Sequence, residues 1–135
     1  METGHISPEE SLILIREARK LGVKKIVVTH AMVPFVNMSV PQMQEAAKMG
    51  AYLELVSTVL FMHRAPGIGE VAAAIKAVGP EHCILSSDLG RADLPLHPDG
   101  LEKFFEALRR LGLKQSEIDR MSKTNPAELL GLGPA

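Results

Sequence analysis

Ile84-Leu85-Ser86-Ser87-Asp88-Leu89-Gly90 is an apolar run that passes through two hydroxyl residues to an acid and a glycine. A short apolar run of this kind is typical of a buried parallel strand. Because α/β sheets carry their chemistry at the carboxyl ends of their strands, the position of Asp88 indicates a functional carboxylate. The alternative interpretation is that Asp88 only caps a loop.

A second stretch has the same layout. Ile26-Val27-Val28-Thr29-His30 is an apolar run that ends in a residue type able to bind metal. Two strands that end in His and Asp predict a single site at the rim of one sheet.

The remaining sequence alternates between helical and strand patterns. The Ser7-Pro8-Glu9-Glu10 segment and the Ser39-Val40-Pro41-Gln42 segment both have the layout of a capping box at a helix start. Strands are predicted at residues 24–29, 51–58 and 82–86. Helices are predicted at residues 8–21, 40–49, 68–78, 98–111, 116–121 and 125–130, the last capped by Asn125.

Strands that alternate with helices predict an α/β fold with a parallel sheet and right-handed crossovers. Two architectures fit this order: a small doubly wound sandwich, or part of a (β/α)8 barrel. A chain of 135 residues is expected to form one domain, residues 1–135, and is long enough to bury a core.

Composition narrows the classes of partner. The formal net charge of -1 gives no reason to expect nucleic acid or an anionic membrane as a partner, and no apolar run is long enough to span a bilayer. The start, METGHISPEE, is polar and lacks the apolar segment of a signal peptide. The single cysteine, Cys83, cannot form an internal disulfide and is expected to be a buried small hydrophobe. We therefore expect a cytoplasmic protein.

Four segments together carry a resemblance to a known family. They are Thr3-Gly4-His5, Val28-Thr29-His30, Ser86-Ser87-Asp88-Leu89-Gly90 and Asn125-Pro126-Ala127-Glu128-Leu129-Leu130-Gly131. The chain resembles the C-terminal half of an amidohydrolase-superfamily metal-dependent hydrolase, and the match covers nearly the whole chain in the family's order. The resemblance implies parallel βα repeats that form half of a (β/α)8 TIM-type barrel.

The resemblance also implies roles for three residues. By position, His5, His30 and Asp88 match metal ligands, and Asp88 also matches the base that accepts a proton from the attacking water. The family's histidine pair of the first strand and its bridging ligand of the fourth strand have no counterpart here. One copy of the chain therefore does not complete a binuclear site by the family's scheme.

Two imidazoles and a carboxylate are a reasonable ligand set for one divalent metal, with zinc preferred. Such a metal lowers the pKa of its bound water to about 7. The expected function is hydrolysis of an amide, ester or phosphoester in a small-molecule substrate by a metal-activated water. The alternative at the residue level is that His30 and Asp88 are only a hydrogen-bonded pair. The alternative function is a non-catalytic half-barrel that serves as an assembly or small-ligand-binding module.

Several further residues are candidates around this site. His63 and Arg64 follow the second strand and Arg91 follows Asp88, so all three are candidate substrate-binding residues, although solvated loops are the simpler interpretation. Glu54 interrupts the apolar run of the second strand. Because a buried carboxylate must be paired or protonated, we expect a Lys or Arg partner for Glu54.

A three-stranded parallel sheet has two open edges, which favours pairing with another chain. Residues 1–6 are long enough to form a short fourth strand beside residues 24–29. Two four-stranded units supply eight strands, the number that closes a barrel around packed side chains. The sequence therefore predicts a homodimer in which both copies of His5, His30 and Asp88 face one mouth.

Overall fold

The computed structural model describes residues 1–132 and contains one parallel sheet. The strand order is β1–β2–β3, with Val28 opposite Leu53 and Leu53 opposite Cys83. The strands are β1 (Val27–Val28), β2 (Tyr52–Val56) and β3 (Cys83–Ser86). The predicted α/β class with parallel strands is therefore confirmed.

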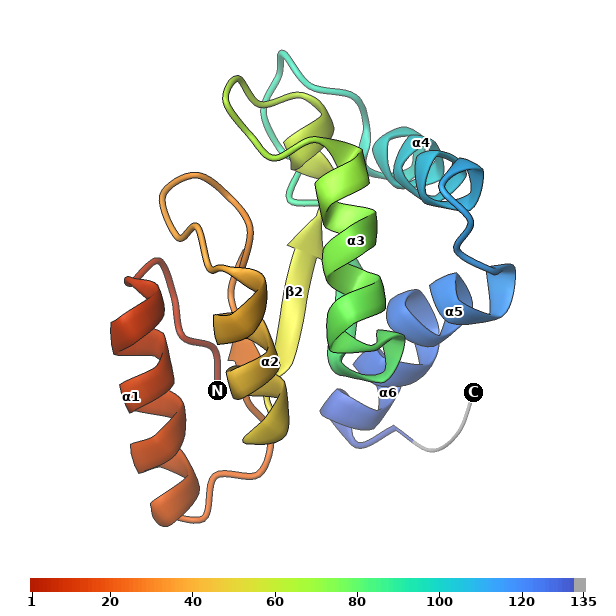
Figure 1. Cartoon of the computed structure of the whole chain (residues 1–135). Helices are drawn as coiled ribbons and strands as arrows, with labels where there is room; N and C mark the ends of the chain where they lie inside the picture. Colours follow the sequence, from red (N-terminus) through yellow and green to blue (C-terminus); the bar gives the residue numbers. More distant parts are fainter. Residues whose placement is uncertain (133–135) are drawn as a thin grey trace.

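Helices separate the strands in the predicted order, and α1, α2 and α3 stand side by side along the sheet (Figure 1). The α-helices are α1 (Pro8–Lys20), α2 (Val40–Lys48), α3 (Ile68–Val78), α4 (His97–Arg110), α5 (Gln115–Asp119) and α6 (Asn125–Leu130). The described residues also contain two 3₁₀ turns, η1 (Ser57–Leu60) and η2 (Pro80–His82), and a π-helical turn, η3 (Arg120–Thr124).

Both predicted capping boxes are present. The Glu10 backbone N–H donates to Ser7 Oγ at 3.2 Å, and the Ser7 N–H donates to Glu10 Oε2 at 3.0 Å. The Ser39 N–H donates to Gln42 Oε1 at 2.9 Å. These bonds satisfy backbone donors that a helix start leaves without partners, so the two helices begin where local sequence places them.

The strands are shorter than the sequence predicts. In residues 24–29 only Val27 and Val28 belong to β1, because other groups take the preceding carbonyls. The Arg19 guanidinium donates to the Lys24 carbonyl at 2.9 Å, and the terminal ammonium donates to the Lys25 carbonyl at 2.8 Å. The run at 51–58 likewise ends as a strand at Val56 and continues as η1.

The N-terminal segment pairs with β1 in parallel, as predicted, although as an isolated bridge rather than a strand. Glu2 lies opposite Val27. The Thr3 N–H donates to the Val27 carbonyl at 3.0 Å, and the Val27 N–H donates to the Met1 carbonyl at 2.9 Å. This pairing brings His5 to the same end of the sheet as His30.

The predicted cap at Asn125 is wrong. Thr124 and Asn125 already have helical backbone angles, because η3 joins α5 to α6 without a break. The Asn125 side chain is buried, and its Nδ2 donates to the carbonyls of Pro80 at 2.8 Å and Cys83 at 2.7 Å. Asn125 therefore fastens the C-terminal helices to β3.

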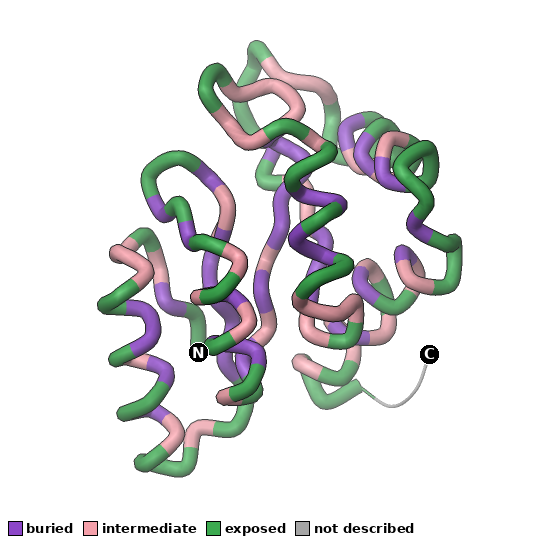
Figure 2. Tube along the Cα trace, viewed as in Figure 1, coloured by how far each residue is buried: buried purple, intermediate pink, exposed green. Residues whose placement is uncertain are grey.

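The core lies between the sheet and its helices, and buried residues follow the strands and the inward sides of α1 and α3 (Figure 2). Leu53 and Leu55 belong to this core, whereas Glu54 lies on the opposite face of β2 because strand side chains alternate. This arrangement is consistent with part of a (β/α)8 barrel, and closure of the barrel by a second copy stays a prediction. In the described residues no helix is both long and apolar enough to cross a bilayer.

Candidate functional site

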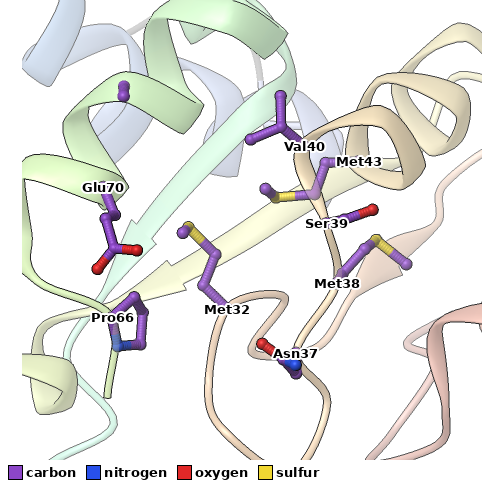
Figure 3. A pocket seen from close by; sticks show the side chains of 9 residues that line it. Met32, Asn37, Met38, Ser39, Val40, Met43, Pro66 and Glu70 are labelled. Atoms are coloured by element: carbon purple, nitrogen blue, oxygen red, sulfur yellow. The ribbon is translucent and has the colours of Figure 1, made fainter. Parts of the chain in front are cut away.

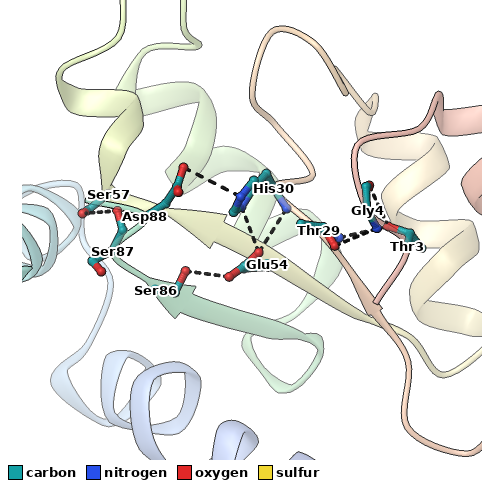
Figure 4. A network of polar contacts seen from close by, with 9 residues as sticks. All are labelled: Thr3, Gly4, Thr29, His30, Glu54, Ser57, Ser86, Ser87 and Asp88. Atoms are coloured by element: carbon teal, nitrogen blue, oxygen red, sulfur yellow. Dashed lines mark hydrogen bonds and ion pairs between the residues drawn. The ribbon is translucent and has the colours of Figure 1, made fainter. Parts of the chain in front are cut away.

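Three titratable side chains meet at the carboxyl ends of the strands (Figure 4). The His30 ring lies between two carboxylates: its Nδ1 is 2.9 Å from Glu54 Oε2, and its Nε2 is 3.8 Å from Asp88 Oδ2. The side chains of His30 and Glu54 are 15% and 17% exposed, and that of Asp88 is 40% exposed. The site is therefore sheltered on the Glu54 side and open to solvent on the Asp88 side.

His30 and Asp88 both have a left-handed backbone conformation, each with φ of 48°. Residues other than glycine seldom adopt this conformation. Those that do are concentrated at functional sites. Glu54 holds the backbone at His30. Its carboxylate accepts the His30 N–H at 3.2 Å, and its main-chain carbonyl accepts the Ala31 N–H at 3.0 Å.

The prediction that a Lys or Arg pairs with Glu54 is wrong. Among the described residues, its carboxylate contacts His30 through Oε2 and accepts a hydrogen bond from Ser86 Oγ on Oε1 at 2.7 Å. Polar hydrogen-bond donors and the His30 imidazole therefore stabilise the Glu54 carboxylate. The sequence predicts only a structural, paired carboxylate at Glu54. The available signal was strand alternation, which places Glu54 on the sheet face away from the helix-packed core.

His5 is brought to the site by the N-terminal bridge. The Gly4 N–H donates to Thr29 Oγ1 at 3.0 Å, and the Thr29 N–H donates to Thr3 Oγ1 at 3.1 Å. The His5 ring centroid lies 5.1 Å from that of His30. His5 and Asp88 thus both lie beside His30, and their predicted role as metal ligands stays a prediction.

A cleft of about 490 Å³ opens beside Asp88. It also contains His97, at the start of α4, whose Nδ1 is 2.7 Å from Ser87 Oγ. The loop after β3 therefore supplies both an acid and a second imidazole to one concave surface. The lining residues are Phe35, Thr58, Met62, Asp88, Leu89, Gly90, Arg91 and His97.

The three candidate substrate-binding residues lie in different places. Arg91 lines the Asp88 cleft, although its guanidinium is paired with Asp93 at 2.7 Å. Arg64 lines a separate hollow with Pro34, and His63 is exposed on the loop before α3. The structure therefore brings only Arg91 to the cleft that contains Asp88.

Another groove, of about 350 Å³, lies between the loop after His30 and the start of α3. Met32, Met38 and Met43 line it, with Glu70 across the gap (Figure 3). Titratable groups converge at the Asp88 cleft and not in this groove. We therefore assign the candidate site to the Asp88 cleft.

Residues 1–132 contain no group of three or more His, Cys, Asp or Glu side chains arranged to hold a metal ion. Two side-chain atoms nevertheless have a separation that suits a zinc ion between them. Ligands of a tetrahedral zinc with bonds of about 2.0–2.2 Å lie about 3.3–3.6 Å apart, close to the 3.8 Å between His30 Nε2 and Asp88 Oδ2. Residues 1–132 thus contain a pair of facing candidate ligands rather than the three protein ligands that a catalytic zinc usually has.

Cys83 does not belong to this site. It is buried in the core, and burial raises the pKa of its thiol to about 12. The expectation of a buried small hydrophobe is therefore confirmed.

A model of a family of unknown function, DUF6282, matches residues 1–54, a segment that contains His5, His30 and Glu54 but not Asp88. No curated protein matches the sequence.

The chain is also similar to the crystal structure of N-acetyl-D-glucosamine-6-phosphate deacetylase from Mycobacterium smegmatis. The TM-score is 0.51 at 19% identity, and the match covers 96% of this chain and 45% of that one. The chain therefore spans less than half the length of the deacetylase and shares its fold over that part. At this identity the likeness concerns the fold alone, and it is consistent with the predicted parallel βα repeats.

Proposed function

We propose that the chain is part of a metal-dependent hydrolase whose reaction takes place in the Asp88 cleft. The observation that carries this proposal is the His30 imidazole held between Glu54 and Asp88, with both strand-end residues in a left-handed conformation. The substrates proposed are small molecules with an amide, ester or phosphoester bond. Because the similar structure is that of a deacetylase, acetamides and acetate esters are the first to screen.

His30 Nε2 and Asp88 Oδ2 would hold a divalent metal, preferably zinc, with His5 beside them. When bound, such an ion lowers the pKa of a coordinated water toward 7 and polarises the bond to be cleaved. Asp88 accepts the proton of the attacking water, for which its solvent-open side is suited. Arg91, which lines the cleft, would contact the substrate, and His63 and Arg64 are further candidates for substrate binding.

Two protein ligands hold zinc weakly, so the proposal includes a second copy of the chain. In a homodimer that completes the barrel, two sets of His5, His30 and Asp88 share one mouth and raise the number of ligands. The rival function is a non-catalytic half-barrel that binds a small ligand or assembles with a partner. The lack of a three-donor cluster among residues 1–132 favours this rival.

Metal binding and hydrolysis by matched variants separate the two functions. Purified protein should take up about one zinc per chain or per dimer. H30N should abolish uptake, whereas H82N, which removes an imidazole at the opposite end of β3, should not. D88N should lower the rate on any substrate found by about 10²-fold or more, the scale of losing a general base.

D119N, a neutralised carboxylate on α5, is the control for D88N and should keep the wild-type rate. Asn tolerates the left-handed conformation, so D88N and H30N should fold normally. Wild-type protein that binds no zinc on titration would contradict the metal-dependent function and support the rival.

A further inference from the structure

Glu54 is the most enclosed charged group at the site, and the proposed reaction does not use it. Its two oxygens have separate partners. Oε1 accepts from Ser86 Oγ at 2.7 Å, whereas Oε2 accepts the His30 N–H at 3.2 Å and lies 2.9 Å from His30 Nδ1.

The contact between Nδ1 and Oε2 is short but not linear. Nδ1 is buried and has no partner along the direction of its ring N–H, so the contact is electrostatic rather than an ideal hydrogen bond. An unprotonated Nδ1 is a negatively polarised acceptor atom, which a carboxylate oxygen at 2.9 Å repels even off the lone-pair axis. A proton on Nδ1 offsets that negative charge and makes the contact less repulsive.

We infer that Glu54 is a positioning residue that holds the proton of neutral His30 on Nδ1 and leaves Nε2 unprotonated toward Asp88. The backbone contacts of Glu54 with His30 and Ala31 hold the ring in register for this role.

This assignment has a consequence on the far side of the ring. An unprotonated Nε2 and the Asp88 carboxylate are both acceptors, and they face each other across 3.8 Å. Two facing acceptors attract a cation or a donor between them. Carboxylates that accept from the second nitrogen of a ligating histidine commonly fix its tautomer, and their loss costs about 10–100-fold in metal affinity.

The inference deepens the proposed function, on which its consequence for metal binding rests, whereas the tautomer itself does not require a bound metal. The test is a long-range ¹H–¹⁵N correlation spectrum of the metal-free protein at about pH 8.5, well above the ordinary histidine pKa of about 6.5. The His30 signals are identified by their loss in H30N. We expect a protonated Nδ1 and an unprotonated Nε2.

E54M removes the acceptor with little change in side-chain length, and the proton should move to Nε2. E128M makes the same change at a carboxylate that contacts Tyr52, and it should leave the His30 spectrum unchanged. A wild-type ring protonated on Nε2, or on both nitrogens, would overturn the inference without any variant. An unchanged tautomer in folded E54M would also overturn it.

Zinc titration of the same samples distinguishes this inference from the proposed function. If the wild type has the expected tautomer but binds no zinc, the positioning role stands and the metal-dependent function fails. If the wild type binds zinc and E54M binds it equally well with an unchanged tautomer, the metal site stands and the role of Glu54 fails. Zinc binding weakened by about 10–100-fold together with a reversed tautomer supports both.

Discussion

His30 and Asp88 illustrate how single residues at strand ends are selected by conformation as well as by chemistry. Within residues 1–132, four residues other than glycine have positive φ, and two of them are these site residues. Glycine or asparagine would adopt this backbone at lower cost. An imidazole and a carboxylate at such positions therefore indicate that the side chains themselves are needed there.

Cys83 provides a prediction at the same scale. Because burial raises its thiol pKa to about 12, only about one thiol in ten thousand is ionised at pH 8. Reaction with a thiol reagent at pH 8 should therefore be slow in the native protein and fast in denaturing urea. The direction of this effect is fixed by the raised pKa, since ionisation is recovered only as pH approaches 12. Rapid labelling of the folded chain would contradict the buried position of Cys83.

Among the helices, Arg19 on α1 contacts the carboxyl end of α2. The Arg19 guanidinium donates to the carbonyls of Met49 at 2.7 Å, Val23 at 3.2 Å and Lys24 at 2.9 Å, and it also contacts that of Gly50. These carbonyls end α2 and precede β1. One side chain thus satisfies acceptors from both connections.

R19A should lower the free energy of unfolding by about 2 kcal/mol, the scale of hydrogen bonds to a charged group. R16A on the same helix is the matched control. Arg16 pairs with Glu45 at 3.4 Å, and both side chains are 51% exposed, so its loss should cost less than about 0.5 kcal/mol. Urea denaturation measures both values, and equal losses in the two variants would contradict the role assigned to Arg19.

For the whole molecule, the edges of the sheet determine how a second chain can join it. At the β3 edge, the Asn125 side chain already donates a hydrogen bond to the Cys83 carbonyl. At the other edge, Met1 and Thr3 use their backbone groups on Val27, so the backbone groups of Glu2 face away from β1. The N-terminal edge is therefore the more open of the two.

A composite barrel predicts a dimer mass by light scattering at micromolar concentration. E2P removes an outward N–H without touching the bonds to Val27, and it should shift the dimer toward monomer, whereas E2Q keeps that N–H and should not. A monomer mass for the wild type would exclude the composite barrel. A dimer that E2P leaves unchanged would show that its contacts lie elsewhere.

Local sequence was sufficient for the features that depend on neighbouring residues. The capping boxes at Ser7 and Ser39, the βα order and the position of His30 and Asp88 after apolar runs all follow from residues within one turn or strand. Because the strands are parallel, their ends had to meet at one rim, which placed these two side chains together.

Only the tertiary structure decided the partners of Glu54, the tie from Asn125 to β3 and the short length of β1. Each depends on groups brought from distant parts of the chain: Ser86 to Glu54, Cys83 to Asn125, and Arg19 to the carbonyl of Lys24. The apolar pattern indicates which residues are buried but does not say which donor reaches a given acceptor. Buried polar groups must be satisfied, and in this protein the packing of the helices determines by which partner.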